Sequence, residues 1–171
     1  MGSGDKPHHD LCRPLGKLLA QKPVHLLTGG GRGTMEAVSQ SFQGQQPRRG
    51  LVVGVLPARG GDASSAPKRG YPNAFVELPV KTHLPLSGRS GQEPLSRNHI
   101  NILTSDVIVV LPGSAGTRSE AELAARYRKP VILFSRDLND FAAFPAEFTR
   151  TTSLAEVEAF IDGHLNGGLK K

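Results

Sequence analysis

The stretch Leu111-Pro-Gly-Ser-Ala-Gly-Thr-Arg-Ser-Glu120 joins a strand to a helix through a turn of small residues. It follows Asp106-Val-Ile-Val-Val-Leu111, an apolar, β-branched run typical of a buried parallel strand. It precedes Ala121-Glu-Leu-Ala-Ala-Arg126, which favours a helix. Such a turn presents backbone N–H groups at the positive end of a helix, where a phosphate binds well. We expect Glu120 in the first turn of that helix, beside the sugar of a bound ligand rather than against its phosphate.

A second loop of the same kind lies earlier in the chain. Val24-His-Leu-Leu-Thr28 predicts a strand, Gly29-Gly-Gly-Arg-Gly-Thr34 a glycine loop, and Met35-Glu-Ala-Val-Ser-Gln-Ser-Phe42 a helix. Glycines also serve ordinary tight turns, so one such loop would be a weak signal. In an open α/β sheet, however, both loops project from the carboxyl ends of strands and can face one crevice. The predicted phosphate-binding residues are Gly29, Gly30, Gly31, Gly113, Ser114, Ala115, Gly116 and Thr117.

The alternation of strands and helices predicts an α/β protein with a three-layer, Rossmann-like fold, in which a mostly parallel sheet is flanked by helices. We expect one nucleotide-binding domain over residues 1–171. Further strands are predicted at 51–56, 74–80 and 130–134, and further helices at 11–21, 95–105 and 153–162. The last helix begins with a capping box of Ser153 and Glu156, and residues 58–73 are expected to form a loop.

The composition narrows the classes of protein that fit. No apolar run approaches the roughly 18 residues of a membrane span, and no signal peptide is evident, so we expect no membrane partner. The single Cys12 excludes an internal disulfide and is compatible with the cytoplasm. We interpret it as a small core residue. Cys and His are too few and too dispersed for a zinc site, and we expect neither a metal nor a cofactor.

The net charge of +6 raises the question of nucleic-acid binding. Basic residues are scattered along the chain, aromatic residues make up only 5%, and Trp is absent. Nucleic-acid surfaces typically cluster basic and aromatic side chains, so we expect no nucleic-acid partner. Some of the positive charge can instead draw a small anionic ligand toward the crevice.

The two loops also carry a resemblance to a known family. The chain resembles the lysine decarboxylase-like family, which includes the Lonely Guy-type phosphoribohydrolases and the molybdenum-cofactor carrier proteins. The family pattern P-G-G-x-G-T-x-x-E stands here as Pro112-Gly-Ser-Ala-Gly-Thr-Arg-Ser-Glu120, and the upstream pattern G-G-G-x-x-G-x-M is matched loosely by Gly29 to Met35. A family arginine upstream of the first pattern corresponds to Arg97. The resemblance extends from about Gly2 to Phe134.

The chain departs from the hydrolase pattern in three places, and the second and third of these departures favour the carrier-protein branch. Ser114 replaces the second glycine, and Ser96-Arg-Asn-His99 lacks the glutamate and lysine that flank the arginine in the plant-type hydrolases. The helix after Glu120 ends early, at Tyr127-Arg-Lys-Pro130. The carrier branch keeps the arginine and the glutamate but is described as binding rather than hydrolysing.

The resemblance implies two functions that the sequence leaves open. In the first, the protein binds a purine nucleoside 5′-monophosphate and hydrolyses its N-glycosidic bond, with Glu120 stabilising positive charge on the ribose and Arg97 fixing the ligand or polarising the base. Thr34, Met35, Asn98 and Asn101 are further candidate ligand contacts. In the second, the same crevice holds a phosphorylated, pterin-type ligand such as the molybdenum cofactor without turnover. A dinucleotide-dependent dehydrogenase fits less well, because Gly29 to Thr34 lacks the G-x-G-x-x-G spacing.

Two further expectations follow from the resemblance. Family members are commonly homodimers, and the helices predicted at 95–105 and 119–127 carry apolar residues that could lie at such an interface. Met1-Gly2-Ser3-Gly4 corresponds to the loop that follows the family's first strand, and that strand has no counterpart here. Either the true start lies upstream, or the chain folds without the strand, or Gly2-Ser3 is the remnant of a tag.

Overall fold

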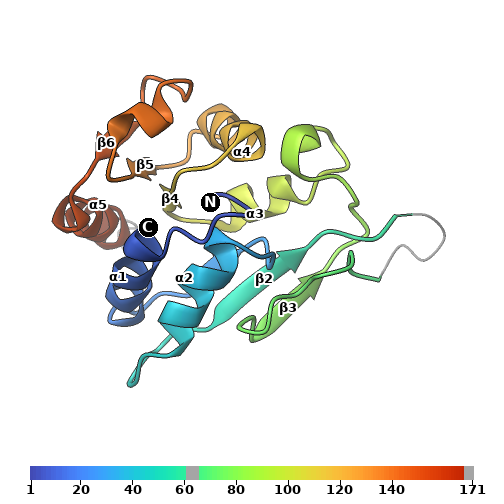
Figure 1. Ribbon diagram of the computed structural model, residues 1–171, viewed down its shortest axis with the longest axis horizontal. Helices are drawn as coiled ribbons and strands as arrows, with labels where there is room; N and C mark the ends of the chain where they lie inside the picture. The colour runs from blue at the N-terminus through green and yellow to red at the C-terminus, as the bar shows by residue number, and fades with distance from the viewer. Residues whose placement is uncertain (61–65, 168–171) are drawn as a thin grey trace.

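The computed structural model describes residues 1–60 and 66–167, in which helices and strands alternate (Figure 1). The strands are β1 (Leu26–Thr28), β2 (Val52–Leu56), β3 (Leu78–Lys81), β4 (Ile108–Val110), β5 (Val131–Phe134) and β6 (Thr149–Thr151). The helices are α1 (His9–Ala20), α2 (Thr34–Gln43), α3 (Asn98–Thr104), α4 (Ala115–Arg126) and α5 (Leu154–Gly167), with short 3₁₀ turns at η1 (Gly88–Ser90) and η2 (Leu138–Phe141). The α/β class and the parallel strand arrangement predicted from the sequence are confirmed.

The strands form two parallel sheets, ordered β1-β2-β3 and β4-β5-β6. Leu27 aligns with Val53 in the first sheet, and Val109 aligns with Ile132 in the second. The strands β1, β2, β4 and β5 come from the β-branched and leucine-rich runs that predicted strands. The two sheets are not joined by a strand pairing between β1 and β4 in the described part of the chain.

The predicted elements are present, with shifted ends and one addition. The sequence did not predict β6, a three-residue strand of polar side chains that pairs with β5. Of the loop expected at 58–73, residues 61–65 lie outside the described part of the chain. No helix within the described residues has the length and apolar character needed to cross a membrane.

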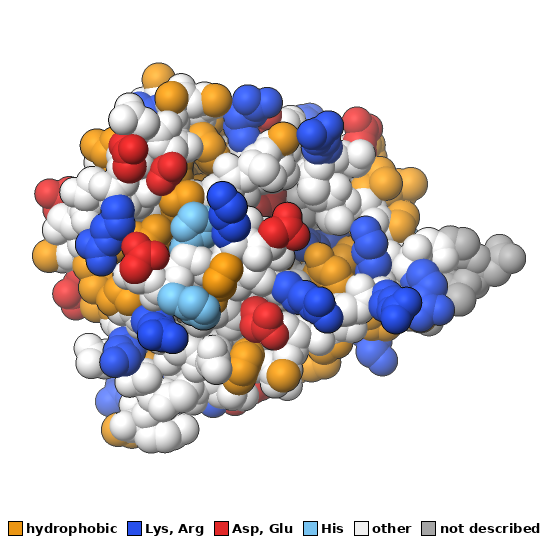
Figure 2. All heavy atoms as spheres, viewed as in Figure 1, with side chains coloured by type: hydrophobic (Ala, Val, Ile, Leu, Met, Phe, Trp, Pro, Cys, Tyr) orange, Lys and Arg blue, Asp and Glu red, His pale blue; other side chains and the backbone are white. Residues whose placement is uncertain are grey.

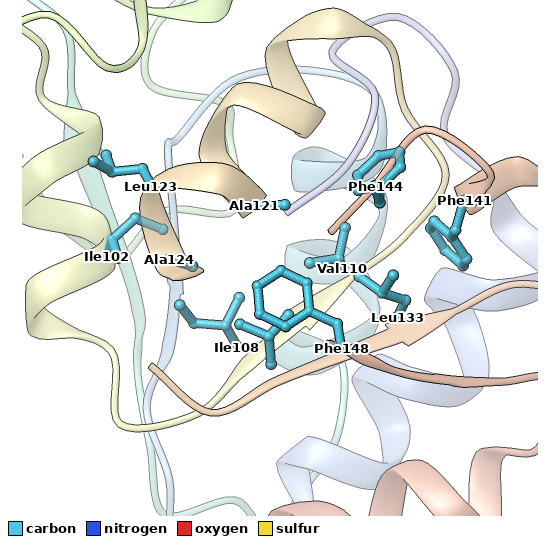
Figure 3. Close-up of a cluster of buried hydrophobic side chains, with 11 residues drawn as sticks. Ile102, Ile108, Val110, Ala121, Leu123, Ala124, Leu133, Phe141, Phe144 and Phe148 are labelled. Carbon is cyan, nitrogen blue, oxygen red and sulfur yellow. The ribbon is translucent and has the colours of Figure 1, made fainter. Parts of the chain in front are cut away.

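An aromatic cluster covers one face of the second sheet (Figure 3). Val110 of β4 and Leu133 of β5 pack under Ala121 of α4, and Phe144 and Phe148 close the cluster from the segment after η2. Small side chains on α4 allow the helix backbone to approach the strands closely. This packing fixes the start of α4 relative to the carboxyl end of β4, where the decisive loop lies.

The opposite face is covered by α1, α2 and α5. Leu11 and Leu15 of α1, Val38 of α2 and Ile161 of α5 pack with Phe134 of β5 in a second cluster. Cys12 belongs to it and has no exposed surface, which confirms the interpretation of a core residue. Burial raises the pKa of its thiol to about 12.

Candidate functional site

The loop after β4 passes directly into α4. Ser114 is the N-cap residue with an extended backbone, and Ala115, Gly116 and Thr117 form the first helical turn. The first hydrogen bond of the helix runs from Arg118 N–H to the Ser114 carbonyl at 3.1 Å. The preceding N–H groups have no acceptor within the helix, as at every helix start, and an anion can accept from them.

Glu120 lies in the second turn of α4, so its predicted place in the first turn is wrong. The helix begins earlier than its apolar pattern indicates, because the small residues from Ala115 to Thr117 adopt helical geometry once Ser114 caps them. The consequence is favourable for a phosphate site, since no acidic residue lies in the first turn to repel an anion.

The first glycine loop connects β1 to α2 at the corresponding place in the other sheet. Gly30 has φ of 71° and Gly33 has φ of 63°, values that side-chain-bearing residues rarely adopt. The buried Asn73 supports the loop from outside, because its N–H donates to the Gly30 carbonyl at 2.8 Å and its Nδ2 to the Gly31 carbonyl at 2.7 Å. Asn73 was not identified from the sequence, because no motif surrounds it. Its contact with the glycine loop forms only when the chain folds.

Arg97 lies between the first glycine loop and Glu120 of α4. Its side chain is buried, and a Cβ placed on Gly29 would lie 2.2 Å from Arg97 Nη2, so only glycine leaves room for the guanidinium there. Arg97 Nη1 donates to Asn98 Oδ1 at 2.6 Å and lies 3.7 Å from Glu120 Oε1. The structure therefore brings Gly29, Arg97 and Glu120 together, although they come from the loop after β1, the N-cap of α3, and α4.

Glu120 is in an environment that disfavours its charge. Burial raises the pKa of the Glu120 carboxyl, while the Arg97 guanidinium and the Met1 ammonium group oppose that increase. The same burial lowers the pKa of the Met1 amino group, which donates to the Val109 carbonyl at 2.7 Å. The carboxyl of Glu120, the guanidinium of Arg97 and the amino group of Met1 thus lie in one region that is largely shielded from solvent.

Four polar side-chain atoms beside this region are buried without a hydrogen-bond partner among the described residues. They are Arg97 Nε, Asn98 Nδ2, Asn101 Oδ1 and Ser119 Oγ. A Cβ on Gly91 would lie 2.4 Å from Asn98 Nδ2 and 3.1 Å from Ser119 Oγ, which places these two atoms around the same glycine. Buried polar groups are normally paired, so atoms of this kind mark places where a ligand or water can bind. Ser119 was not among the residues predicted from the sequence.

Two of the other predicted contacts have different surroundings. The Thr34 N–H donates to the Ser3 carbonyl at 2.9 Å and its hydroxyl to the Lys6 carbonyl at 3.0 Å, so both donors of Thr34 already have acceptors in the N-terminal segment. Met35 contributes to the walls of two cavities beside the first glycine loop. Asn98 and Asn101 are both buried on α3 rather than on a solvent-facing side.

A cavity of about 620 Å³ connects these groups. One end is lined by Gly29, Arg97, Gly116, Thr117 and Glu120. A second cavity of about 460 Å³ lies outside the first glycine loop, between Arg32, Arg69 and Tyr71. Elsewhere on the face shown in Figure 2, Lys and Arg side chains are interspersed with Asp and Glu. Such a mixture of positive and negative side chains is typical of a solvated surface, whereas basic residues lie close to the candidate site.

Metal ligands are not gathered anywhere in residues 1–60 and 66–167, where no group of three or more His, Cys, Asp or Glu side chains could hold an ion. The chemistry available at the site is therefore that of backbone N–H groups, one guanidinium, one carboxyl and several amides and hydroxyls. This set binds an anion and recognises hydrogen-bonding groups beside it.

Comparison with known proteins shows the family of the chain and similar folds. The model of the SLOG cluster4 family matches residues 1–161. An uncharacterized protein of Archaeoglobus fulgidus is 30% identical over 130 residues, which cover 76% of this chain and 72% of that protein. Among solved structures, the molybdenum cofactor binding protein of Rippkaea orientalis is 28% identical with a TM-score of 0.70, covering 93% of this chain and 88% of its own. The molybdenum cofactor carrier protein of Chlamydomonas reinhardtii is 25% identical with a TM-score of 0.68, covering 97% and 95%.

Proposed function

Because the chain belongs to the SLOG cluster4 family, whose members are Lonely Guy-like, we propose that it binds a small phosphorylated ligand at its paired glycine loops and carries that ligand without turnover. The favoured ligand is of the pterin type, such as the molybdenum cofactor, because two similar solved proteins are named for binding or carrying it. Open α/β sheets generally bind ligands at the carboxyl ends of their strands, which supports a site at these two loops.

The observation that carries the proposal is that residues of both loops line one cavity together with Arg97. The phosphate would accept from the N–H groups of Ala115, Gly116 and Thr117 at the start of α4, and Arg97 would neutralise part of its charge. The unpartnered amides of Asn98 and Asn101 would then meet the hydrogen-bonding edge of the ligand's ring system. Each of these groups is already in place before the ligand binds, which lowers the cost of ordering the site.

Hydrolysis of a nucleoside 5′-monophosphate is the second candidate. The pair of Arg97 and Glu120, 3.7 Å apart beside both loops, favours it, since a carboxylate there can stabilise a cationic ribose and a guanidinium can polarise the base. Burial weighs against it, because the raised pKa of Glu120 reduces the negative charge available for that task.

One experiment separates the two candidates. The purified protein is incubated with a panel of purine nucleoside 5′-monophosphates, and in parallel with the molybdenum cofactor, and the products and the retained ligand are analysed by chromatography. Recovery of intact cofactor, with no free base or ribose 5-phosphate released, supports the carrier. Release of base that falls on the order of 100-fold in Glu120→Gln supports the hydrolase. Equal release by wild type and variant excludes a role of Glu120 in catalysis.

We also propose that the protein is a homodimer that acts in the cytoplasm as one domain. Leu95, just before α3, and Leu103, within it, are about half exposed, which favours an apolar contact on this side of the molecule. Sedimentation at micromolar concentration tests this proposal, and a species of 18.2 kDa that persists as concentration rises would exclude the dimer. The double variant Leu95→Glu/Leu103→Glu is expected to shift a dimer toward that mass.

A further inference from the structure

A second cavity adjoins the candidate ligand site, on the outer side of the first glycine loop. It has a volume of about 460 Å³ and is lined by Gly4, Arg32, Met35, Arg69, Gly70 and Tyr71. Three of these residues, Gly4, Met35 and Tyr71, also line the larger cavity that contains Arg97 and Glu120. We call the smaller space the outer cavity and the larger one the inner cavity. The two cavities meet at the three shared residues, so a long ligand can occupy both.

The outer cavity carries two positive charges. Arg32 and Arg69 both line it, and both side chains are exposed. Neither takes part in an ion pair among the described residues, although the adjoining segments contain the acidic residues Asp5 and Glu36. A space lined by charges of one sign attracts a ligand of the opposite sign. Guanidinium groups are well suited to a phosphate, because they can donate two parallel hydrogen bonds to its oxygens.

Tyr71 gives the outer cavity an aromatic wall. A Cβ placed on Gly31 would lie 2.7 Å from Met35 Cε and 3.0 Å from Tyr71 Cε1, so the absence of a side chain at Gly31 allows the ring to approach the glycine loop. The Tyr71 side chain is half-buried, which leaves part of it accessible to a ligand. Aromatic rings bind the planar bases of nucleotides by stacking. Two guanidinium groups beside an aromatic ring therefore form a set of groups that recognises a phosphate together with a base.

The segment that forms this wall is held at both ends. The Lys68 N–H donates to the Pro57 carbonyl at 2.9 Å, after the end of β2, and the Asn73 N–H donates to the Gly30 carbonyl at 2.8 Å in the glycine loop. Residues 69–71, which line the outer cavity, lie between these two hydrogen bonds. The outer cavity is thus formed before a ligand binds, which lowers the cost of ordering it.

We propose that the outer cavity is a second nucleotide-binding subsite, so that the ligand of this protein is of the dinucleotide type, with two phosphorylated halves joined through a pyrophosphate. This inference rests on the proposed function, in which the first half binds in the inner cavity at the start of α4. The second half places its phosphate between the guanidinium groups of Arg32 and Arg69 and its base against the ring of Tyr71. A mononucleotide in the inner cavity leaves both guanidinium groups without an anion.

The test is a titration of the isotope-labelled protein, followed by the amide chemical shifts. The probes are adenosine 5′-monophosphate, diadenosine 5′,5′-pyrophosphate and inorganic pyrophosphate, which has no base that the site could reject. The amides of Ala115 and Gly116 report on the inner cavity, and those of Arg32 and Gly70 report on the outer cavity. The dinucleotide is expected to shift both sets and to bind about tenfold or more tightly than the monophosphate, because its two halves are linked.

The two sets of amides separate the failure of this inference from the failure of the proposed function. Shifts confined to the inner set with all three probes would overturn the outer subsite and leave the proposed phosphate site intact. Shifts confined to the outer set would support the subsite and contradict the proposed phosphate site. The absence of any shift in the outer set, whatever the inner set does, would overturn the inference.

A pair of matched double variants tests which charges are responsible. Arg32→Gln/Arg69→Gln is expected to reduce the affinity ratio of dinucleotide to monophosphate from about tenfold to about one, and to abolish the shift of the Gly70 amide by pyrophosphate. Lys17→Gln/Arg126→Gln removes the same charge from exposed positions in the last turns of α1 and α4, and it should preserve both effects. An unchanged ratio in the first variant, or an equal fall in both variants, would overturn the assignment of the subsite to Arg32 and Arg69.

The aromatic wall is tested at Tyr71. Tyr71→Leu is expected to weaken binding of the dinucleotide by about tenfold, whereas Tyr71→Phe, which keeps the ring, should bind it as the wild type does. Inorganic pyrophosphate has no base, so neither change is expected to alter the shift of the Gly70 amide that it causes. Equal weakening of dinucleotide binding by the two changes would show that the hydroxyl, and not stacking on the ring, is what the ligand uses, and would overturn the assignment of the base to this wall.

Discussion

The guanidinium of Arg97 lies 3.7 Å from the carboxyl of Glu120. Arg97 is 3% exposed as a residue, whereas 18% of the Glu120 side chain remains exposed. The burial of this pair is therefore intermediate. A surface ion pair contributes little to stability. In a fully buried ion pair, loss of one partner leaves an isolated buried charge that strongly destabilises the protein.

Removal of one partner from this pair is expected to cost more stability than removal of both. Arg97→Met leaves Glu120 without its guanidinium and is expected to lower the free energy of unfolding by about 3 kcal/mol. Glu120→Gln added to Arg97→Met removes the isolated carboxylate and should recover part of that loss. Urea unfolding of wild type, both single variants and the double variant measures the coupling. Strict additivity of the single changes would show that the two side chains do not interact.

The start of α4 is expected to tolerate a branched side chain poorly at Gly116. A Cβ there would lie 3.1 Å from the Gly88 Cα in η1, so the two branches of valine would displace η1 and block the approach of a ligand to the helix N–H groups. Gly116→Val is expected to weaken binding of the phosphorylated ligand by 100-fold or so, a loss of about 3 kcal/mol. Gly163→Val is the matched control, since Gly163 is also helical but faces open space. Isothermal titration of both variants checks this, and unchanged affinity in a folded Gly116→Val protein would exclude this loop from the site.

Cys12 is expected to be inert while the protein is folded. Its pKa of about 12 lies three units above the ordinary value of 9.0, so the reactive thiolate at pH 8 is about 1000-fold scarcer than in a free thiol. Alkylation by iodoacetamide should therefore be slow in buffer and fast in urea, where the thiol is exposed. Rapid modification of the folded protein would mean that α1 opens away from the core on the timescale of the reaction.

The local sequence predicted the strands other than β6, and the two loops, because those features depend on short-range patterns. The apolar run ending at Leu111 and the glycines from Gly29 to Gly31 each carry their signal within a few residues. The start of α4 was missed because Ala115 and Gly116 carry no apolar periodicity, and their helical geometry depends on the cap at Ser114. The side of α4 on which Glu120 lies was therefore not predictable, although its proximity to the loop was.

The remaining parts of the candidate site depend on contacts between distant segments. Asn73 supports the first glycine loop from a separate segment, and Ser119 is buried beside Asn98 of another helix. The Met1 nitrogen bonds to Val109, more than one hundred positions away. These contacts join residues that are far apart in the sequence. They produce no helical or strand periodicity, so the sequence patterns could not predict them.

The buried amino group of Met1 is expected to make the protein's stability depend on pH. Burial holds its pKa below the ordinary value of 8.0, so between that lowered value and pH 8.0 the unfolded chain binds more protons than the folded chain. The free energy of unfolding attributable to this group therefore rises as pH rises through that window and becomes constant above it. Acetylation of the Met1 nitrogen removes the titrating group while keeping an N–H for the Val109 carbonyl. Urea midpoints measured from pH 6 to pH 9 should increase more steeply for the free amine than for the acetylated protein, because the two forms differ only at the Met1 nitrogen. Parallel pH profiles for the two forms would mean that the Met1 amino group is solvated rather than buried against β4.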